Sequence, residues 1–155
     1  MGKLAVLASQ GKVYGLDYSK ESVNVASKTN REQIAAGRVE ILEGNVSQLP
    51  FSAGMFDLVT AVETHFWWPD LPAGMCEMLR VLKPGGTLII IAEIYRGAAT
   101  ASAKLAEKYL PLSGMTLLTV NEHRDLFSNA GFSRIEIVEE SGKGWICGIG
   151  RKPLA

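Results

Sequence analysis

The stretch VYGLDYS (residues 13–19) decides the fold. Its apolar residues favour a short buried strand. Asp17 stands where this strand should end, and Ser19 can cap a helix that follows directly. In an open parallel sheet, ligands bind at the carboxyl ends of the strands, and an acid placed there can accept hydrogen bonds from both hydroxyls of a ribose. The alternative is that Asp17 is a solvated loop acid or a second helix cap.

The composition predicts one ordinary globular domain over residues 1–155. With 155 residues, 47% of them hydrophobic and 21% charged, the chain can bury roughly 68–70% of its unfolded surface. The 16 Lys and Arg balance the 16 Asp and Glu, which argues against a nucleic-acid partner. No apolar run reaches the ~18 residues of a membrane span, and the N-terminus is too short for a signal peptide. Cys76 and Cys147 lack metal-ligand spacing, so we expect a cytoplasmic protein with reduced thiols and no metal.

Helical and strand patterns alternate along the chain. Helices are predicted at 3–10, 20–36, 71–82, 101–110 and 120–130, and strands at 12–17, 38–42, 56–62, 87–92, 133–139 and 144–150. The last two strands are joined by a short Ser-Gly connection, which predicts an antiparallel hairpin. Together these elements predict an α/β doubly wound, mostly parallel sheet with one antiparallel strand at its edge.

Five short segments follow one another at regular intervals: VYGLDYS (13–19), EGNVSQLPF (43–51), FDLVTAVET (56–64), RVLKPGGTLII (80–90) and AGFSRIEI (130–137). In this order they resemble the class I S-adenosylmethionine-dependent methyltransferases, particularly the small-molecule enzymes of ubiquinone and menaquinone biosynthesis. The resemblance implies a Rossmann-like fold, S-adenosylmethionine as cofactor and a small-molecule methyl acceptor. A nicotinamide oxidoreductase shares the acid after the first strand, but no hydride-transfer pair is visible.

The resemblance also implies roles for residues at the ends of the first two strands. Asp17 matches the acid that bridges the ribose hydroxyls, and Tyr18 matches the residue that lies against the adenine. Asn45 stands where the family usually has an aspartate that reads the adenine amino group, and its amide oxygen can accept the same hydrogen bond. Val46 would offer its backbone N–H to an adenine nitrogen. The alternative for Asn45 is an ordinary turn residue.

A second group of candidates follows the strand at 56–62. By the same resemblance, Glu63 and Thr64 lie near the methionine part of the cofactor. Trp67 and Trp68 either contact a ligand, as the wall of an apolar acceptor pocket or through cation–π attraction to a sulfonium, or they pack under the following helix. Both hypotheses for the tryptophans stay open at this point.

Methyl transfer from a sulfonium needs mainly proximity and orientation from the protein, so no obligatory catalytic residue is expected. His65 is the candidate general base for an acceptor hydroxyl, and the alternative is a solvated imidazole. Tyr95, just past a central strand, is a candidate contact of the acceptor, and solvation at a helix terminus is its alternative. We expect His123, in a polar helical segment, at the surface.

One part of the family pattern is missing. Members begin with a strand and a G-x-G-x-G loop, whose glycines let the backbone approach the cofactor, and this chain has no such motif. The missing strand belongs between the strands at 12–17 and 56–62, whose edges are then unpaired. Three arrangements resolve this: an N-terminally truncated domain, direct pairing of the two strands, or a strand supplied by a homodimer partner. We therefore expect impaired cofactor binding, and the alternative function is a non-catalytic interaction domain.

Overall fold

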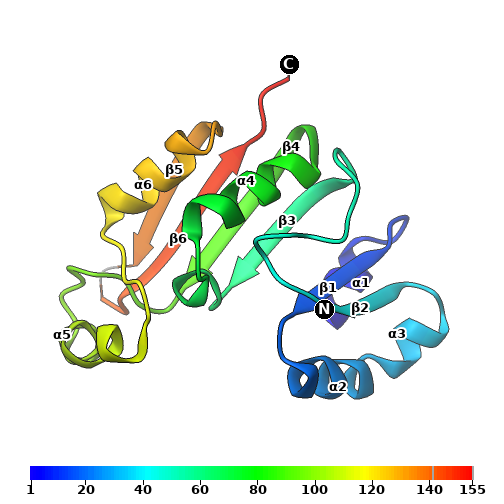
Figure 1. Cartoon of the computed structure of the whole chain (residues 1–155), viewed down its shortest axis with the longest axis horizontal. Coiled ribbons are helices and arrows are strands. Elements are labelled where there is room, and N and C mark those ends of the chain that lie inside the picture. The colour runs from blue at the N-terminus through cyan, green and yellow to red at the C-terminus, as the bar shows by residue number, and fades with distance from the viewer. Residues whose placement is uncertain (141, 155) are drawn as a thin grey trace. The chain divides into compact units, whose positions relative to one another are not determined.

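The structure, a computed structural model, describes residues 1–140 and 142–154 (Figure 1). It divides into two compact units, Met1–Pro50 and Phe51–Ala155. The first unit contains a two-stranded sheet, β1-β2, and the second contains a four-stranded sheet in the order β3-β4-β6-β5. Among the described residues, no helix is long and apolar enough to cross a membrane.

The first unit is built around two parallel strands. Its elements are α1 (Gly2–Leu7), β1 (Val13–Asp17), α2 (Lys20–Thr29), α3 (Arg31–Ala35) and β2 (Val39–Glu43). Ser19 caps α2 as predicted, because its side chain accepts a hydrogen bond from the Ser22 N–H. The single helix predicted at 20–36 is wrong, since it is divided at Asn30. The Asn30 side chain donates to the Ala26 carbonyl over 2.8 Å, and this local bond favours a helix end over a continuing helix.

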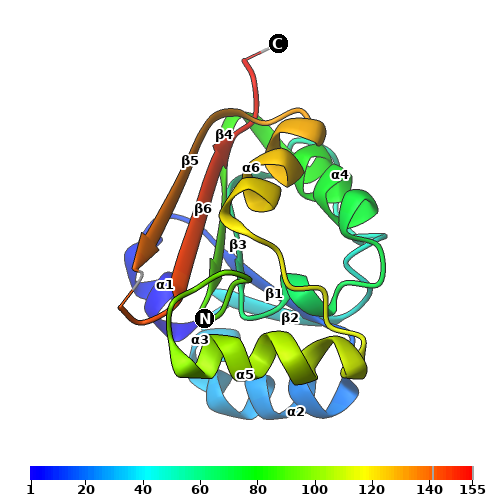
Figure 2. The ribbon, with the colours of Figure 1, turned by 90° about the vertical axis from the view of Figure 1, so that its left-hand side faces the viewer.

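The second unit carries the remaining elements. They are β3 (Phe56–Val62), η1 (His65–Trp67), α4 (Leu71–Val81), β4 (Leu82–Ala92), α5 (Ala101–Tyr109), η2 (Leu110–Ser113), α6 (Val120–Asn129), β5 (Ser133–Glu140) and β6 (Trp145–Arg151). Asp70 caps α4, as the sequence predicts, by accepting from the Ala73 N–H. Helices α4 and α6 cover the same face of the sheet (Figures 1 and 2).

The sheet of the second unit mixes strand directions. β3 pairs with β4 in parallel, whereas β6 pairs antiparallel with both β4 and β5. The predicted hairpin is confirmed, although its connection includes residue 141, which lies outside the described residues. The predicted edge position of the antiparallel strand is wrong, because β6 lies between β4 and β5.

Two glycines of β6 make room for helix α6. A Cβ on Gly148 or Gly150 would stand 2.7 or 2.5 Å from the Phe127 ring of α6. These glycines therefore let the helix approach β6 closely, while β5 stays mostly exposed on the edge. The core between sheet and helices is made of fully buried apolar side chains: Met75, Val81, Leu82, Leu88, Ile90 and Phe127.

β1 and β3 belong to different sheets. Direct pairing of these two strands, one of the three arrangements expected for the missing strand, stays a prediction. The backbone of each strand is already satisfied on one side, by β2 and by β4 respectively. A truncated domain and a strand from another chain remain predictions.

Candidate functional site

Two candidate residues come together at the carboxyl ends of β1 and β2. Asp17 is the last residue of β1 and lies opposite Glu43. The Gly44 N–H donates to the Asp17 carbonyl over 2.9 Å, so the loop that carries Asn45 begins directly beside Asp17. One carboxylate oxygen of Asp17 accepts from the Ser19 N–H over 2.9 Å. Within the described part of the chain, this is the carboxylate's single hydrogen bond, which leaves acceptor capacity for a ligand.

The residues that follow these strand ends offer three further groups to a ligand. The Tyr18 side chain is 81% exposed, so its ring is free to lie against a flat ligand. The loop after β2 is a tight turn, because the Asn45 side-chain oxygen accepts from the Ser47 N–H over 2.9 Å. The N–H of half-buried Val46 has no acceptor among the described residues. A carboxylate, an exposed ring, an amide and a free N–H can together bind a flat polar ligand that carries hydroxyl groups.

In the second unit, Glu63 connects the ends of β3 and β4. Its N–H donates to the Ile91 carbonyl over 2.9 Å, and its carboxylate accepts from the Glu93 N–H. Burial raises the pKa of this carboxyl group. The backbone of Glu63 has φ +56°, a left-handed conformation that non-glycine residues rarely adopt and that often marks functional sites. Thr64, next to it, is exposed.

The two tryptophans differ in placement. The Trp68 indole lies on Gly74 of α4, where an added Cβ would stand 2.6 Å from its Cε3 atom. This is the packing alternative considered for the pair. Trp67 is 51% exposed and contacts Phe66 edge-on at 6.2 Å between ring centroids. Of the two, Trp67 is therefore the one with open aromatic surface.

The two histidines are both buried, at 1% exposure each. Their Nε2 atoms lie 3.1 Å apart. Burial and the neighbouring His123 lower the pKa of His65 to about 3, and burial also lowers the pKa of His123. The predicted surface position of His123 is wrong, because the helix turns this residue, together with Phe127, toward the interior. His65 is not solvated either, and a role as general base would require it to leave this position.

Tyr95 is also an interior residue, at 3% exposure. It packs with Phe66 and Ile146 in one hydrophobic cluster, and its hydroxyl donates to the Glu139 carboxylate over 2.6 Å. This bond raises the pKa of Tyr95 to about 12. The alternative of a solvated helix terminus is wrong for this residue, and the structure gives it no open surface for an acceptor.

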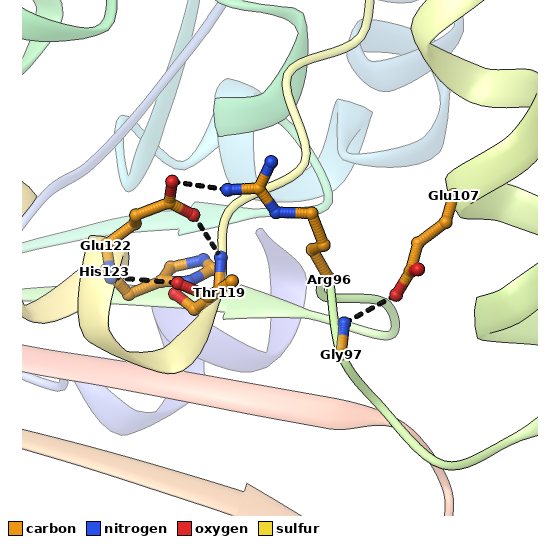
Figure 3. A network of polar contacts seen from close by, with 6 residues as sticks. All are labelled: Arg96, Gly97, Glu107, Thr119, Glu122 and His123. Atoms are coloured by element: carbon orange, nitrogen blue, oxygen red, sulfur yellow. Dashed lines mark hydrogen bonds and ion pairs between the residues drawn. The ribbon is translucent and has the colours of Figure 1, made fainter.

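A polar network surrounds the start of α6 (Figure 3), and only part of it can be read from the sequence. Thr119 and Glu122 form a capping box, with the Thr119 N–H donating to Glu122 over 2.7 Å. The Arg96 guanidinium also donates to Glu122, and the two partners lower the pKa of Glu122 to about 2. The T-x-x-E spacing is readable in the sequence. The contact with Arg96, 26 residues away, has no local signal.

Comparison with known proteins supplies the family. Residues 2–90 match the family described as a methyltransferase domain. The chain is 29% identical over 152 residues to the demethylmenaquinone methyltransferase of Oceanobacillus iheyensis, covering 85% of this chain and 63% of that protein. It is 30% identical to the demethylmenaquinone methyltransferase of Lactococcus lactis, and this match covers 85% of this chain and 60% of that protein. The chain thus spans about three-fifths of the length of these curated relatives.

A solved structure supports the same assignment at the level of the fold. A SAM-dependent methyltransferase of Thermotoga maritima matches with a TM-score of 0.73 at 22% identity, covering 97% of this chain and 77% of that one. This likeness confirms the Rossmann-like α/β fold with antiparallel C-terminal strands. On the match over residues 2–90, the chain belongs to the methyltransferase domain family.

Proposed function

We propose that this chain binds S-adenosylmethionine and serves in the transfer of its methyl group to a small apolar acceptor of the quinol class. The observation that carries the proposal is the position of the Asp17 carboxylate beside the loop that holds Asn45 and Val46. The names of the curated relatives, demethylmenaquinone methyltransferases, support the acceptor class.

The first unit holds the nucleoside. The Asp17 carboxylate accepts hydrogen bonds from the two ribose hydroxyls, and the exposed Tyr18 ring lies against the adenine. The free N–H of Val46 donates to an adenine nitrogen, and the Asn45 oxygen accepts from the adenine amino group. Each hydrogen bond to the charged carboxylate is worth about 1.5–3 kcal/mol, which makes Asp17 the largest single contributor in this set.

The second unit serves the reacting end. Glu63 and Thr64, at the carboxyl end of β3, contact the methionine part, and the open face of Trp67 contacts the acceptor. The cofactor brings the activated methyl group on its sulfonium, and the protein residues bind and orient the two reactants. Both nitrogens of His65 are withdrawn from solvent, so this proposal assigns it no proton transfer.

We further propose that cofactor affinity is reduced in this chain, because no G-x-G-x-G segment is available to hold the amino-acid portion. A strand supplied by another copy or another chain would pair with a free strand edge. A second function is favoured by the same missing glycine motif. On that alternative, the chain is a non-catalytic interaction domain that retains the fold.

Calorimetric titration of the purified chain with S-adenosylhomocysteine tests the proposal, with the oligomeric state read by light scattering. Micromolar binding supports a functional nucleoside site, and binding restricted to a dimer supports completion by a second copy. A folded chain that binds no S-adenosylhomocysteine contradicts the proposal and favours the non-catalytic alternative.

A further inference from the structure

His65 and His123 are the two histidines of the chain, and the proposed function uses neither. His65 opens η1, directly after the end of β3, and His123 lies in the first turns of α6. Each is 1% exposed, and their Nε2 atoms are 3.1 Å apart. Two buried imidazoles in direct contact need an explanation, because a histidine is easily protonated near neutral pH.

The hydrogen-bond partners determine where the protons are. The Nδ1 atom of His123 lies 2.8 Å from the Thr119 carbonyl oxygen, which can only accept, so this Nδ1 carries a hydrogen. The Nε2 of neutral His123 is then an acceptor, and the Nε2 of His65 must donate to it. The Nδ1 of His65 remains a buried lone pair without a partner among the described residues.

This arrangement has no place for an additional proton. A proton on His65 Nδ1 would create a buried N–H that has no acceptor in the described surroundings. A proton on His123 Nε2 would set two N–H groups face to face between the rings. Either form also places a positive charge in a site that burial makes unfavourable for charge.

The charged groups near the histidine pair do not make its protonation favourable. Glu122 favours the protonated form of His123, but its carboxylate is already bound to the Arg96 guanidinium and the Thr119 N–H. Arg124 and Asp125, the next charged residues of α6, are exposed. His65 is bordered by the Phe66 ring, at 5.2 Å between centroids, and the charge that acts on it is that of His123.

The histidine pair connects helix α6 to residues 63–68, which include candidate binding residues. His123 is fixed by the capping box of α6. His65 belongs to residues 63–68, which include Glu63, Thr64 and Trp67. The segment is also held at its start by the bonds of Glu63 to Ile91 and Glu93, in its middle by the Thr116 N–H bond to the Phe66 carbonyl, over 2.9 Å, and at its end by the packing of Trp68 on α4.

We propose that His123 is a positioning residue that acts through His65: it holds residues 63–68 in place while both imidazoles are neutral and releases them on acidification. The effect on cofactor binding rests on the proposed function, whereas the effect on residues 63–68 does not. In the closed state both imidazoles resist protonation, and in the open state they regain their ordinary pKa near 6.5. The closed state is therefore fully favoured above pH 6.5 and is lost progressively as the pH falls.

Imidazole nitrogen NMR on the full chain tests the closed state directly, since two histidines give an easily assigned spectrum. We expect a His65 with hydrogen on Nε2, a His123 with hydrogen on Nδ1, no titration of His65 between pH 8 and pH 5.5 in the folded protein, and a His123 midpoint below its ordinary value. Midpoints near 6.5, or the opposite tautomers, would overturn the proposal. This measurement needs no variant and no ligand.

Amide hydrogen exchange tests the release. The Trp67 and Trp68 N–H groups are bonded to the Thr64 and His65 carbonyls over 3.0 and 3.1 Å, so they report opening of the segment. After correction for the intrinsic exchange rate, the fraction of molecules in which these two amides are open should rise as the pH falls below 6.5. Each histidine that is protonated only in the open state contributes a rise of up to about tenfold per pH unit. The amide of Ile137 in β5 should show no such rise.

Two variants separate positioning from general stability. His123→Gln should reduce the pH dependence of the Trp67 and Trp68 amides, whereas Arg124→Gln, a charge change at the next and exposed position of α6, should leave it as in the wild type. An unchanged pH dependence in His123→Gln would overturn the proposal. Should His123→Gln fail to fold, the imidazole spectrum of the wild-type chain still decides. None of these readouts uses the cofactor, so they fail or succeed independently of S-adenosylhomocysteine binding.

Discussion

The Trp68 indole and Gly74 of α4 are in such close contact that a Cβ on the glycine would stand 2.6 Å from the indole Cε3 atom. A glycine inside a helix normally costs about 1 kcal/mol relative to alanine. Here the missing side chain makes room for a large ring, which fixes the end of the segment that carries Glu63, Thr64 and Trp67.

Gly74→Ala should therefore destabilise the protein in spite of its better helix propensity. We expect a loss of about 1–3 kcal/mol in the free energy of unfolding, the usual range for overpacking, measured by urea denaturation. Gly2→Ala is the matched control, because this helical glycine in α1 has room for a Cβ, with its nearest contact at 3.5 Å. A Gly74→Ala variant that is more stable than the wild type would contradict the packing described for Trp68.

The capping box of α6 gives a second prediction. Thr119→Ala removes the hydroxyl that accepts from the Glu122 N–H and should cost about 0.5–2 kcal/mol of stability. Thr119→Ser keeps the hydroxyl and should retain most of the wild-type stability. Chemical denaturation of both variants checks this, and equal midpoints for Thr119→Ala and the wild type would refute the role of the cap.

Tyr95 provides a prediction at alkaline pH. The bond to Glu139 raises its folded pKa to about 12 from an ordinary value of 10, so the stabilisation is complete below pH 10 and is lost as the pH rises toward 12. Phenolate absorbance should show one ionisation step near pH 12 that is missing from Tyr95→Phe. If the step that Tyr95→Phe removes lies near pH 10 instead, the buried bond does not exist in solution.

The histidine pair predicts an acid-sensitive stability. Because both folded pKa values are lowered from 6.5, the free energy of unfolding should decrease between pH 7 and pH 5.5, by about 1 kcal/mol for His65 and further for His123. Urea denaturation at the two pH values measures the difference. His123→Gln should reduce the decrease, and a wild-type stability that is equal at both pH values would be inconsistent with a neutral, buried pair.

The features that the sequence predicts correctly have local causes. Ser19 and Asp70 signal helix starts through the side-chain oxygen that each offers to an N–H a few residues later. Asp17 is found at a strand end because apolar residues before it and a cap after it define both boundaries. These signals lie within a few residues of the feature they specify, so one sequence is enough to read them.

The features that the sequence does not predict depend on distant partners. His65 and His123 are separated by 58 residues, and Tyr95 and Glu139 by 44, so no local pattern shows that these polar groups are buried together. The place of β6 inside the sheet likewise depends on its pairing with β4, which is distant in the sequence. Such placements follow from the packing of whole elements, which residue periodicity does not specify.

The central claim is that the Asp17 carboxylate binds the cofactor ribose, and the most direct test compares two isosteric variants by calorimetry with S-adenosylhomocysteine. Asp17→Asn should weaken binding about 10- to 100-fold, as expected for loss of one hydrogen bond to a charged group, since the amide oxygen can still accept the other. Glu43→Gln removes the same charge from the residue opposite Asp17 in the sheet and should leave the affinity unchanged. Equal affinities of Asp17→Asn and the wild type would contradict the account.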